Sequence, residues 1–244
     1  MTFSEIEKER IHKFIKQAIK KFDLNLKGLT VFTEAASGNY MYTSIAAALA
    51  GAKQVFAIAK DSRYGTKEEI KKQTIAEAKK LEVDNKIKII FENNLADLSK
   101  CDIITNSGFV RPITKELIFH LKPTAVIPLM YETWEFRKED LDLDSCRSHG
   151  ILVLGTNEEC PPMDIMRYSG FLASKLMFEC KQEVHKDNIL VIGSGRLGNN
   201  LAQFMQANKI NFSWISLDNN IRKENKQYLS KIEIIRKNCL NLIQ

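Results

Sequence analysis

The sequence predicts an α/β protein in which a doubly wound parallel sheet is followed by a second, smaller α/β unit. From Gly28 onward, apolar runs of strand length alternate with helix-length segments, which is typical of a parallel sheet covered by helices on both faces. A segment that opens with Pro161-Pro162 and becomes polar after a helix separates this part from the next. A glycine-rich turn then follows one more strand, in the run NILVIGSGRLGNN. We therefore expect a doubly wound, Rossmann-like α/β domain followed by a second, incomplete Rossmann unit.

The expected boundaries are an N-terminal amphipathic helix over 1–27, a substrate-type Rossmann-like domain over 28–157, a connecting helix over 158–187 and a partial dinucleotide-binding unit over 188–244. Apolar residues of the first helix, over 4–22, recur at helical spacing. They are Ile11, Phe14, Ile15, Ala18, Ile19 and Phe22, with Ser4 as the expected N-cap. This face indicates packing on the helix's own domain; a partner-binding arm is the alternative.

Strands and helices are expected to alternate within the first domain. The expected strands are 29–35, 53–61, 86–92, 101–108, 124–131 and 151–157, and the expected helices are 39–51, 67–81, 113–121 and 139–150. Right-handed crossovers make such a sheet doubly wound and place ligands at the carboxyl ends of its strands. In the remaining chain we expect a helix over 164–180, a strand over 189–192, a helix after the glycine turn and a strand over 211–218.

Composition excludes several classes of protein. The 244 residues carry a net charge of +6, but the lysines are spread along helix-like segments without the interleaved aromatics of a nucleic-acid surface. The five cysteines form no pair at metal-ligand spacing, so we expect free thiols and no metal. The charged N-terminus and short apolar runs indicate neither a signal peptide nor a membrane span. The sequence therefore predicts a cytoplasmic protein.

The glycine turn matches GxGxxG between a strand and an amphipathic helix. Gly193 allows the tight turn, Gly195 lets a pyrophosphate approach the backbone, and Gly198 lets the helix pack on the strand. The strand that follows ends at Asp218, where a carboxylate would bind the ribose and repel a 2′-phosphate, so NAD is expected rather than NADP. The expected cofactor-binding residues are Gly193, Ser194, Gly195, Arg196, Leu197, Gly198 and Asp218. A turn that serves only strand–helix packing is the alternative.

The run VIGSGRLGNNLAQF resembles the cofactor-domain entry of the D-isomer-specific 2-hydroxyacid dehydrogenases. The upstream runs VRPITKELIFHL and DLDLDSCRSHGILVLGTNEECP are similar to the segments that precede it in that family, so the resemblance covers roughly residues 100–218. It implies NAD(P) binding and hydride transfer on a small hydroxy or keto acid. Two features depart from the family. The family's catalytic Arg, Glu and His find no matching positions after Asp218, and the loop LMYETWEFRK has no glycine where the family binds the substrate carboxylate.

The first strand and its turn offer a rival cofactor site. The run VFTEAASGNYMYTSIAAALAGAKQVFAIAKD is similar to the first motif of class I S-adenosylmethionine-dependent methyltransferases, with Glu34, Ala36 and Gly38 in the motif and Asp61 at the ribose position. Ala36 stands where a glycine is usual. A methyltransferase-like protein that uses this unit is therefore an alternative function, and a non-catalytic nucleotide-binding protein is another.

Polar residues collect at the expected carboxyl ends of the strands, where ligands bind in parallel sheets. The candidates for catalysis are Arg111, Tyr131 and Glu132, because a guanidinium can hold a carboxylate and the other two can exchange a proton. The candidates for substrate binding are Glu34, Ser37, Asn39, Arg63, Asn106, Trp134 and Asn157. A small-molecule substrate is the expected partner, and the open sheet edge of the second unit favours a dimer.

Overall fold

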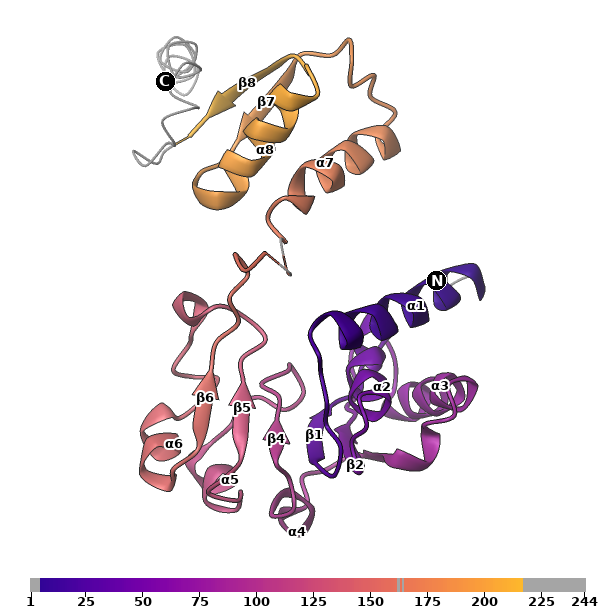
Figure 1. Cartoon of the computed structure of the whole chain (residues 1–244), viewed down its shortest axis with the longest axis vertical. Coiled ribbons are helices and arrows are strands. Elements are labelled where there is room, and N and C mark those ends of the chain that lie inside the picture. The colour runs from indigo at the N-terminus through magenta and orange to yellow at the C-terminus, as the bar shows by residue number, and fades with distance from the viewer. Residues whose placement is uncertain (1–4, 162, 164, 217–244) are drawn as a thin grey trace. The chain divides into compact units, whose positions relative to one another are not determined.

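The computed structural model describes residues 5–161, 163 and 165–216. Contacts divide the chain into two compact units, Met1–Asn157 and Glu158–Gln244, which we name unit 1 and unit 2 (Figure 1). The expected N-cap Ser4 and the expected ribose-binding Asp218 both lie outside the described residues. None of the described helices has both the length and the apolar character needed to cross a membrane.

Unit 1 is built on a six-stranded sheet in which every strand pair is parallel. The strand order is β3-β2-β1-β4-β5-β6, which confirms the predicted doubly wound, Rossmann-like fold. The strands are β1 (Thr30–Glu34), β2 (Gln54–Ile58), β3 (Ile87–Ile90), β4 (Ile103–Ile104), β5 (Val126–Pro128) and β6 (Leu152–Leu154). The order reverses between β1 and β4, so the carboxyl ends of these two strands form the topological switch point.

The helices of unit 1 occupy most of the expected segments. They are α1 (Glu5–Lys21), α2 (Tyr42–Leu49), α3 (Lys67–Lys80), α4 (Leu95–Leu98), α5 (Lys115–Phe119) and α6 (Leu143–His149), with 3₁₀ turns at Gly38–Met41, Asp84–Lys86 and Thr133–Glu135. No sequence pattern indicates α4, because a single turn capped by Asn94 is shorter than one hydrophobic period. Helix α3 begins at a capping box, in which Thr66 and Glu69 satisfy each other's backbone N–H groups.

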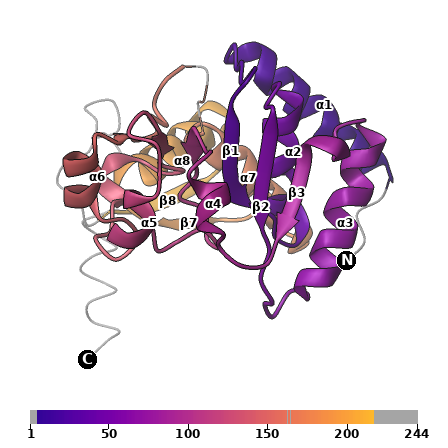
Figure 2. The ribbon, with the colours of Figure 1, turned by 90° about the horizontal axis from the view of Figure 1, so that it is seen from below.

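Alternate residues of the central strands belong to two separate hydrophobic cores, one on each face of the sheet. Val31 and Val55 belong to the core under α2 and α3, whereas Phe32, Phe56 and Ile104 belong to the core on the other face, with side chains of α5 and α6. Figure 2 shows α1, α2 and α3 grouped beside β1, β2 and β3, with α4, α5 and α6 on the opposite side.

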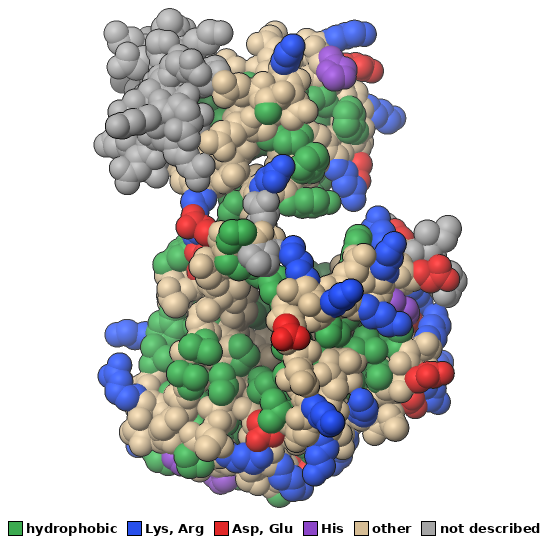
Figure 3. Space-filling model, viewed as in Figure 1, with side chains coloured by type: hydrophobic (Ala, Val, Ile, Leu, Met, Phe, Trp, Pro, Cys, Tyr) green, Lys and Arg blue, Asp and Glu red, His purple; other side chains and the backbone are tan. Residues whose placement is uncertain are grey.

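The two faces of the edge strand β6 are covered unequally. Val153 packs against the core on one face, but Leu152 and Leu154, which point to the other face, are 53% and 51% exposed. Within unit 1 the helices on that face contact β1, β2 and β3, so the edge strand extends beyond them. Hydrophobic side chains gather over this region in Figure 3.

Helix α1 packs on unit 1 through a narrower stripe than the sequence predicts. Ile11, Ile15 and Ile19 contact the core, whereas Phe14 and Phe22 are 56% and 47% exposed, so their predicted burial is wrong. The stripe is narrow because α1 lies on the outside of the helical layer, where its main contacts are with α2.

Unit 2 consists of a two-stranded parallel sheet and two helices in the part that the structure describes. The elements are α7 (Tyr168–Glu179), β7 (Ile189–Ile192), α8 (Gly195–Ala207) and β8 (Phe212–Ile215). Val191 pairs with Trp214, and both are buried against Ala202 and Met205 of α8. Gly170 brings α7 close to α8, because a Cβ there would lie 2.1 Å from the ring of Phe204.

Candidate functional site

The predicted glycine motif forms the connection between β7 and α8. The chain leaves the strand at Gly193 and enters the helix at Gly195, whose φ of +65° is a left-handed conformation that favours glycine. The N–H of Gly193 donates to the carbonyl of Ile215 at 3.0 Å. The turn is therefore fixed to the end of β8 before the helix begins.

Gly198 provides the close contact between helix and strand that the sequence predicts. A Cβ at this position would lie 2.8 Å from the Gly193 carbonyl oxygen and 3.4 Å from Cζ2 of Trp214. Trp214 is only 1% exposed, and its indole N–H donates to the same Gly193 carbonyl at 2.8 Å. This hydrogen bond from Trp214 holds the Gly193 carbonyl, and with it the turn, in place. The sequence alone did not indicate the contact.

The space beside the start of α8 is open. An added Cβ would meet nothing within 4 Å at either Gly193 or Gly195. The first-turn N–H groups of a helix have no carbonyl partner within it and attract anions. Ser194 lies at the N-cap, where its hydroxyl accepts from that of Ser216 at 3.3 Å. A phosphate group fits this backbone, because the positions closest to it lack side chains.

Arg196 and Leu197, which are also predicted cofactor residues, lie in the first turn of α8. The Arg196 guanidinium pairs with the Glu159 carboxylate at 3.2 Å, and Leu197 is 58% exposed. Asn199, which the sequence did not single out, is 6% exposed and donates to the Gly195 carbonyl at 2.7 Å. Its side chain stabilises the first turn of α8.

Some of the predicted rim residues of unit 1 lie at the topological switch point, and the buried Glu34 is one of them. Glu34 ends β1, is 4% exposed, and accepts a hydrogen bond from the Phe109 N–H at 2.8 Å in the loop after β4. Burial raises the pKa of Glu34 above its ordinary value, although the Phe109 N–H and the Arg111 guanidinium oppose that shift. Glu34 therefore holds its proton to a higher pH than an exposed glutamate does.

Asn106, Arg111 and Tyr131 come together beside Glu34. Asn106 is fully buried and its Oδ1 accepts from the Met130 N–H at 2.7 Å, which joins the ends of β4 and β5. Arg111 pairs with Asp140 at 2.7 Å. The sequence did not predict Asp140 as a partner, because 29 residues separate the two and no motif joins them. We name Glu34, Asn106, Arg111, Tyr131 and Asp140 the switch-point cluster.

Two polar atoms of the cluster have no hydrogen-bond partner of ordinary geometry among the described residues. They are Nδ2 of Asn106 and the hydroxyl of Tyr131, and both are buried. The Tyr131 hydroxyl nevertheless lies within hydrogen-bonding reach of the Asn106 amide and of the Asp140 carboxylate. Burial raises the pKa of Tyr131, the Asn106 amide and the charge of Arg111 lower it, and Asp140 raises it further. The hydroxyl therefore stays protonated at neutral pH and can donate a hydrogen bond.

The other candidate residues lie on loops around the sheet. Ser37 precedes the 3₁₀ turn after β1, and Asn39 is an exposed residue within that turn. The Arg63 guanidinium donates to the Tyr64 hydroxyl. Glu132 is buried and accepts from the indole N–H of Trp134, which is 69% exposed.

Two further candidates from the sequence, Asn157 and Asp61, are not part of the switch-point cluster. Asn157 is exposed and is the last residue of unit 1. The rival ribose position, Asp61, accepts from the Lys67 N–H at 2.7 Å and so supports the start of α3.

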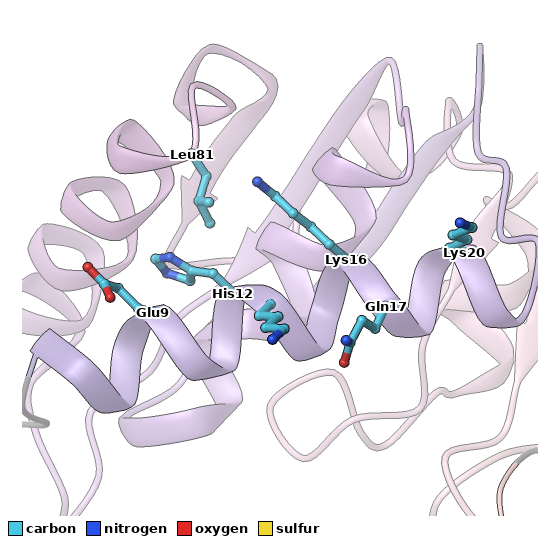
Figure 4. A pocket seen from close by; sticks show the side chains of 7 residues that line it. Glu9, His12, Lys16, Gln17, Lys20 and Leu81 are labelled. Carbon is cyan, nitrogen blue, oxygen red and sulfur yellow. The ribbon is translucent and has the colours of Figure 1, made fainter.

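An open hollow of about 530 Å³ runs along α1. It is lined by Glu9, His12, Lys13, Lys16, Gln17, Lys20 and Leu81. Figure 4 shows His12 and Lys16 pointing toward Leu81, at the end of α3. His12 also pairs with the buried Glu77 carboxylate at 2.9 Å. Among the described residues, no three His, Cys, Asp or Glu side chains gather as they would around a metal ion.

No protein-family model matches the chain, and no curated protein matches it. Among solved structures it is similar to a dipicolinate synthase from Bacillus halodurans, with 15% identity, a TM-score of 0.47, and coverage of 84% of this chain and 67% of that one. It is also similar to the shikimate 5-dehydrogenase of Listeria monocytogenes in complex with shikimate and NAD, with 14% identity, a TM-score of 0.42, and coverage of 62% and 52%.

The chain therefore spans about half the length of that shikimate dehydrogenase. A phosphoglycerate oxidoreductase from Vibrio cholerae is similar at 13% identity and a TM-score of 0.39, over 82% of this chain and 59% of that one. The fold assignment follows from the order and direction of the strands.

Proposed function

We propose that the chain binds NAD at the β7–α8 turn and acts as an NAD(P)-dependent oxidoreductase on a small hydroxy or keto acid. The observation that carries the proposal is the packing of Gly198 against the Gly193 carbonyl, combined with the left-handed Gly195 at the start of α8. Together these positions give the tight turn and close helix approach that a dinucleotide pyrophosphate needs.

The residues of the turn have distinct roles in this proposal. Gly195 and the residues after it direct first-turn N–H groups at the pyrophosphate, and the positive end of the α8 dipole adds to the attraction. Trp214 holds the Gly193 carbonyl and so keeps the turn in place. When bound, NAD supplies the hydride acceptor. Asp218 binds the adenosine ribose and disfavours NADP through repulsion of its 2′-phosphate.

The experiment is a calorimetric titration of NADH into the unmodified chain and into Gly193→Val. Gly193 does not have a left-handed backbone, and an added Cβ meets nothing within 4 Å, so the variant should fold normally. A side chain there enters the space beside the helix start and should weaken NADH binding at least tenfold. Gly195→Val is less informative, because its positive φ would strain the backbone as well.

A matched control is Ala207→Val, which adds bulk at the exposed, opposite end of α8 and should leave NADH affinity unchanged. NADPH should bind the unmodified chain more weakly than NADH. The proposal fails if the unmodified chain shows no saturable NADH binding, or if Gly193→Val binds NADH as tightly as the unmodified chain.

A further inference from the structure

We infer that the hollow along α1 is a binding site for a linear oligophosphate, whose phosphate groups are held by Lys13, Lys16 and Lys20. We name these three residues the lysine row. The hollow belongs to unit 1 and the glycine turn to unit 2, so the inference goes beyond the proposed function and does not depend on it. The ligand class is a chain of linked phosphates, either inorganic or at the end of a nucleotide.

The first argument is that the hollow is a fixed feature of unit 1. Its volume of about 530 Å³ is in the range of pockets that bind small molecules. Helix α1 forms one side, and Figure 4 shows Lys16 pointing toward Leu81, at the end of α3. The buried Glu77 carboxylate of α3 joins the two helices, because it pairs with His12 at 2.9 Å and with Lys8 at 3.6 Å. The two sides of the hollow are therefore held at a set spacing.

The second argument is the positive charge that the fold leaves over in the hollow. The lysine row shares the lining with one acidic residue, Glu9, so the lining carries a surplus of two positive charges. Lys8 and Lys80, on the same two helices, both pair with Glu77. By contrast, no lysine of the row forms an ion pair within the part of the chain that the structure describes. A ligand with two or more negative charges would neutralise the surplus.

The third argument is the spacing and chemistry of the lysine row. Its members follow one another at i, i+3 and i+7, so they lie on one face of α1 and extend over about 10 Å of the helix axis. All three are exposed, and Figure 3 shows Lys and Arg side chains gathered over α1. A row of cations suits a ligand that repeats its negative group along a chain.

The type of cation favours phosphate over carboxylate. An ammonium group is a compact point charge that binds phosphate, whereas the planar fork of arginine suits carboxylates as well. The described lining residues include three lysines and no arginine. The lining therefore fits a chain of phosphates better than a polycarboxylate.

The experiment is a calorimetric titration of inorganic tripolyphosphate into the full chain, without any dinucleotide and without Mg²⁺. Tripolyphosphate should bind saturably. Orthophosphate, which offers a single phosphate group, should bind at least tenfold more weakly. Added salt should weaken tripolyphosphate binding, because exposed charges are screened. The inference is overturned if tripolyphosphate does not bind, or if orthophosphate binds as tightly.

The decisive variant combines Lys13→Gln with Lys16→Gln. Both side chains are exposed, and glutamine has nearly the helix propensity of lysine, so the variant should unfold at the same temperature as the unmodified chain. Its tripolyphosphate affinity should fall at least tenfold, because two of the three charged contacts are lost. Lys13→Arg with Lys16→Arg keeps the charges and should retain binding. Unchanged affinity in the glutamine variant overturns the inference.

The matched control combines Lys60→Gln with Lys138→Gln. Both lysines are exposed and neither lines the hollow, so this control removes the same net charge from elsewhere on unit 1. It should bind tripolyphosphate as the unmodified chain does. An equal loss of affinity in the control and in the decisive variant would show an effect of net charge alone and would overturn the inference.

The glycine turn of unit 2 is itself proposed to bind a pyrophosphate, so Gly193→Val separates the two sites. Tripolyphosphate should bind Gly193→Val as tightly as the unmodified chain, and NADH should bind the lysine-to-glutamine variant as tightly as the unmodified chain. Loss of tripolyphosphate binding in Gly193→Val would move the phosphate site to unit 2 and overturn the inference. ATP titrated into Gly193→Val then identifies the source of the phosphates. Tighter binding of ATP than of tripolyphosphate supports a nucleotide at the hollow, and weaker binding supports an inorganic chain there.

Discussion

Replacement of Gly198 by alanine should destabilise unit 2 because α8 has no room to accept a methyl group. The new Cβ would lie 2.8 Å from the Gly193 carbonyl oxygen and 3.0 Å from its carbon, both rigid backbone atoms. Ordinary van der Waals contact begins at 3.4 Å, so the start of α8 must move by about 0.6 Å. Overpacking of this kind costs about 1–3 kcal/mol of unfolding free energy.

Urea denaturation followed by Trp214 fluorescence measures this cost locally. The chain has two tryptophans, and Trp134 is exposed, so a Trp134→Phe background leaves the buried Trp214 as the reporter. With a slope near 1–2 kcal/mol per molar urea, the midpoint for Gly198→Ala should fall by about 1 M at an unchanged slope. The same shift of α8 moves its first-turn N–H groups and should weaken NADH binding.

Gly193→Ala is the matched control, because its Cβ meets nothing within 4 Å. Its midpoint should stay within the range of an ordinary surface substitution, about 0.5 kcal/mol. A Gly198→Ala midpoint equal to that of Gly193→Ala would refute the close packing of helix, turn and strand from which the cofactor site is inferred.

Two further predictions concern unit 1. Burial alone would raise the pKa of Asp102, but the Lys122 ammonium at 2.6 Å and a backbone N–H hold it below its ordinary value. Its stabilising contribution is therefore present above the unfolded pKa of about 3.9 and is lost as the pH falls through the folded pKa. Asp102→Asn should lower stability by about 1–3 kcal/mol at pH 7, and the difference from the unmodified chain should shrink as the pH falls through the folded pKa. Burial raises the pKa of Cys101 to about 12 and that of Cys146 to about 11. Iodoacetamide at pH 8 should therefore modify the exposed Cys180 and leave these two thiols unmodified until the protein unfolds. Peptide mass spectrometry measures which thiols have reacted.

The strands and helices of unit 1 could be predicted because the hydrophobic pattern that indicates each of them lies within a few consecutive residues. The run QVFAI is apolar at four of its five positions, and TVFTE has apolar Val and Phe between β-branched threonines. Both runs are buried along nearly their whole length, as is typical of a parallel strand covered on both faces. The exposure of Leu152, Leu154 and Phe14 could not be predicted, because it depends on where the helical layer ends. The local sequence shows that a residue is apolar, but it does not show which part of the fold covers that residue.

The glycine turn could be assigned residue by residue, whereas the switch-point cluster could be predicted only as a set of strand ends. Gly195 and Gly198 act through backbone geometry that a motif encodes. The pairing of Arg111 with Asp140 and the support of Gly193 by Trp214 join residues 29 and 21 positions apart. No spacing rule joins such residues, because the crossovers between strands decide which of them meet.

The most direct test of the central claim is energy transfer from Trp214 to bound NADH in the Trp134→Phe background. Trp214 donates a hydrogen bond to the turn that is assigned to the pyrophosphate, so bound NADH must lie close to its indole ring. The account predicts saturable quenching of the Trp214 emission with a matching rise in NADH emission, and the loss of both in Gly193→Val. Saturable binding of NADH by calorimetry with no change in either emission would contradict it.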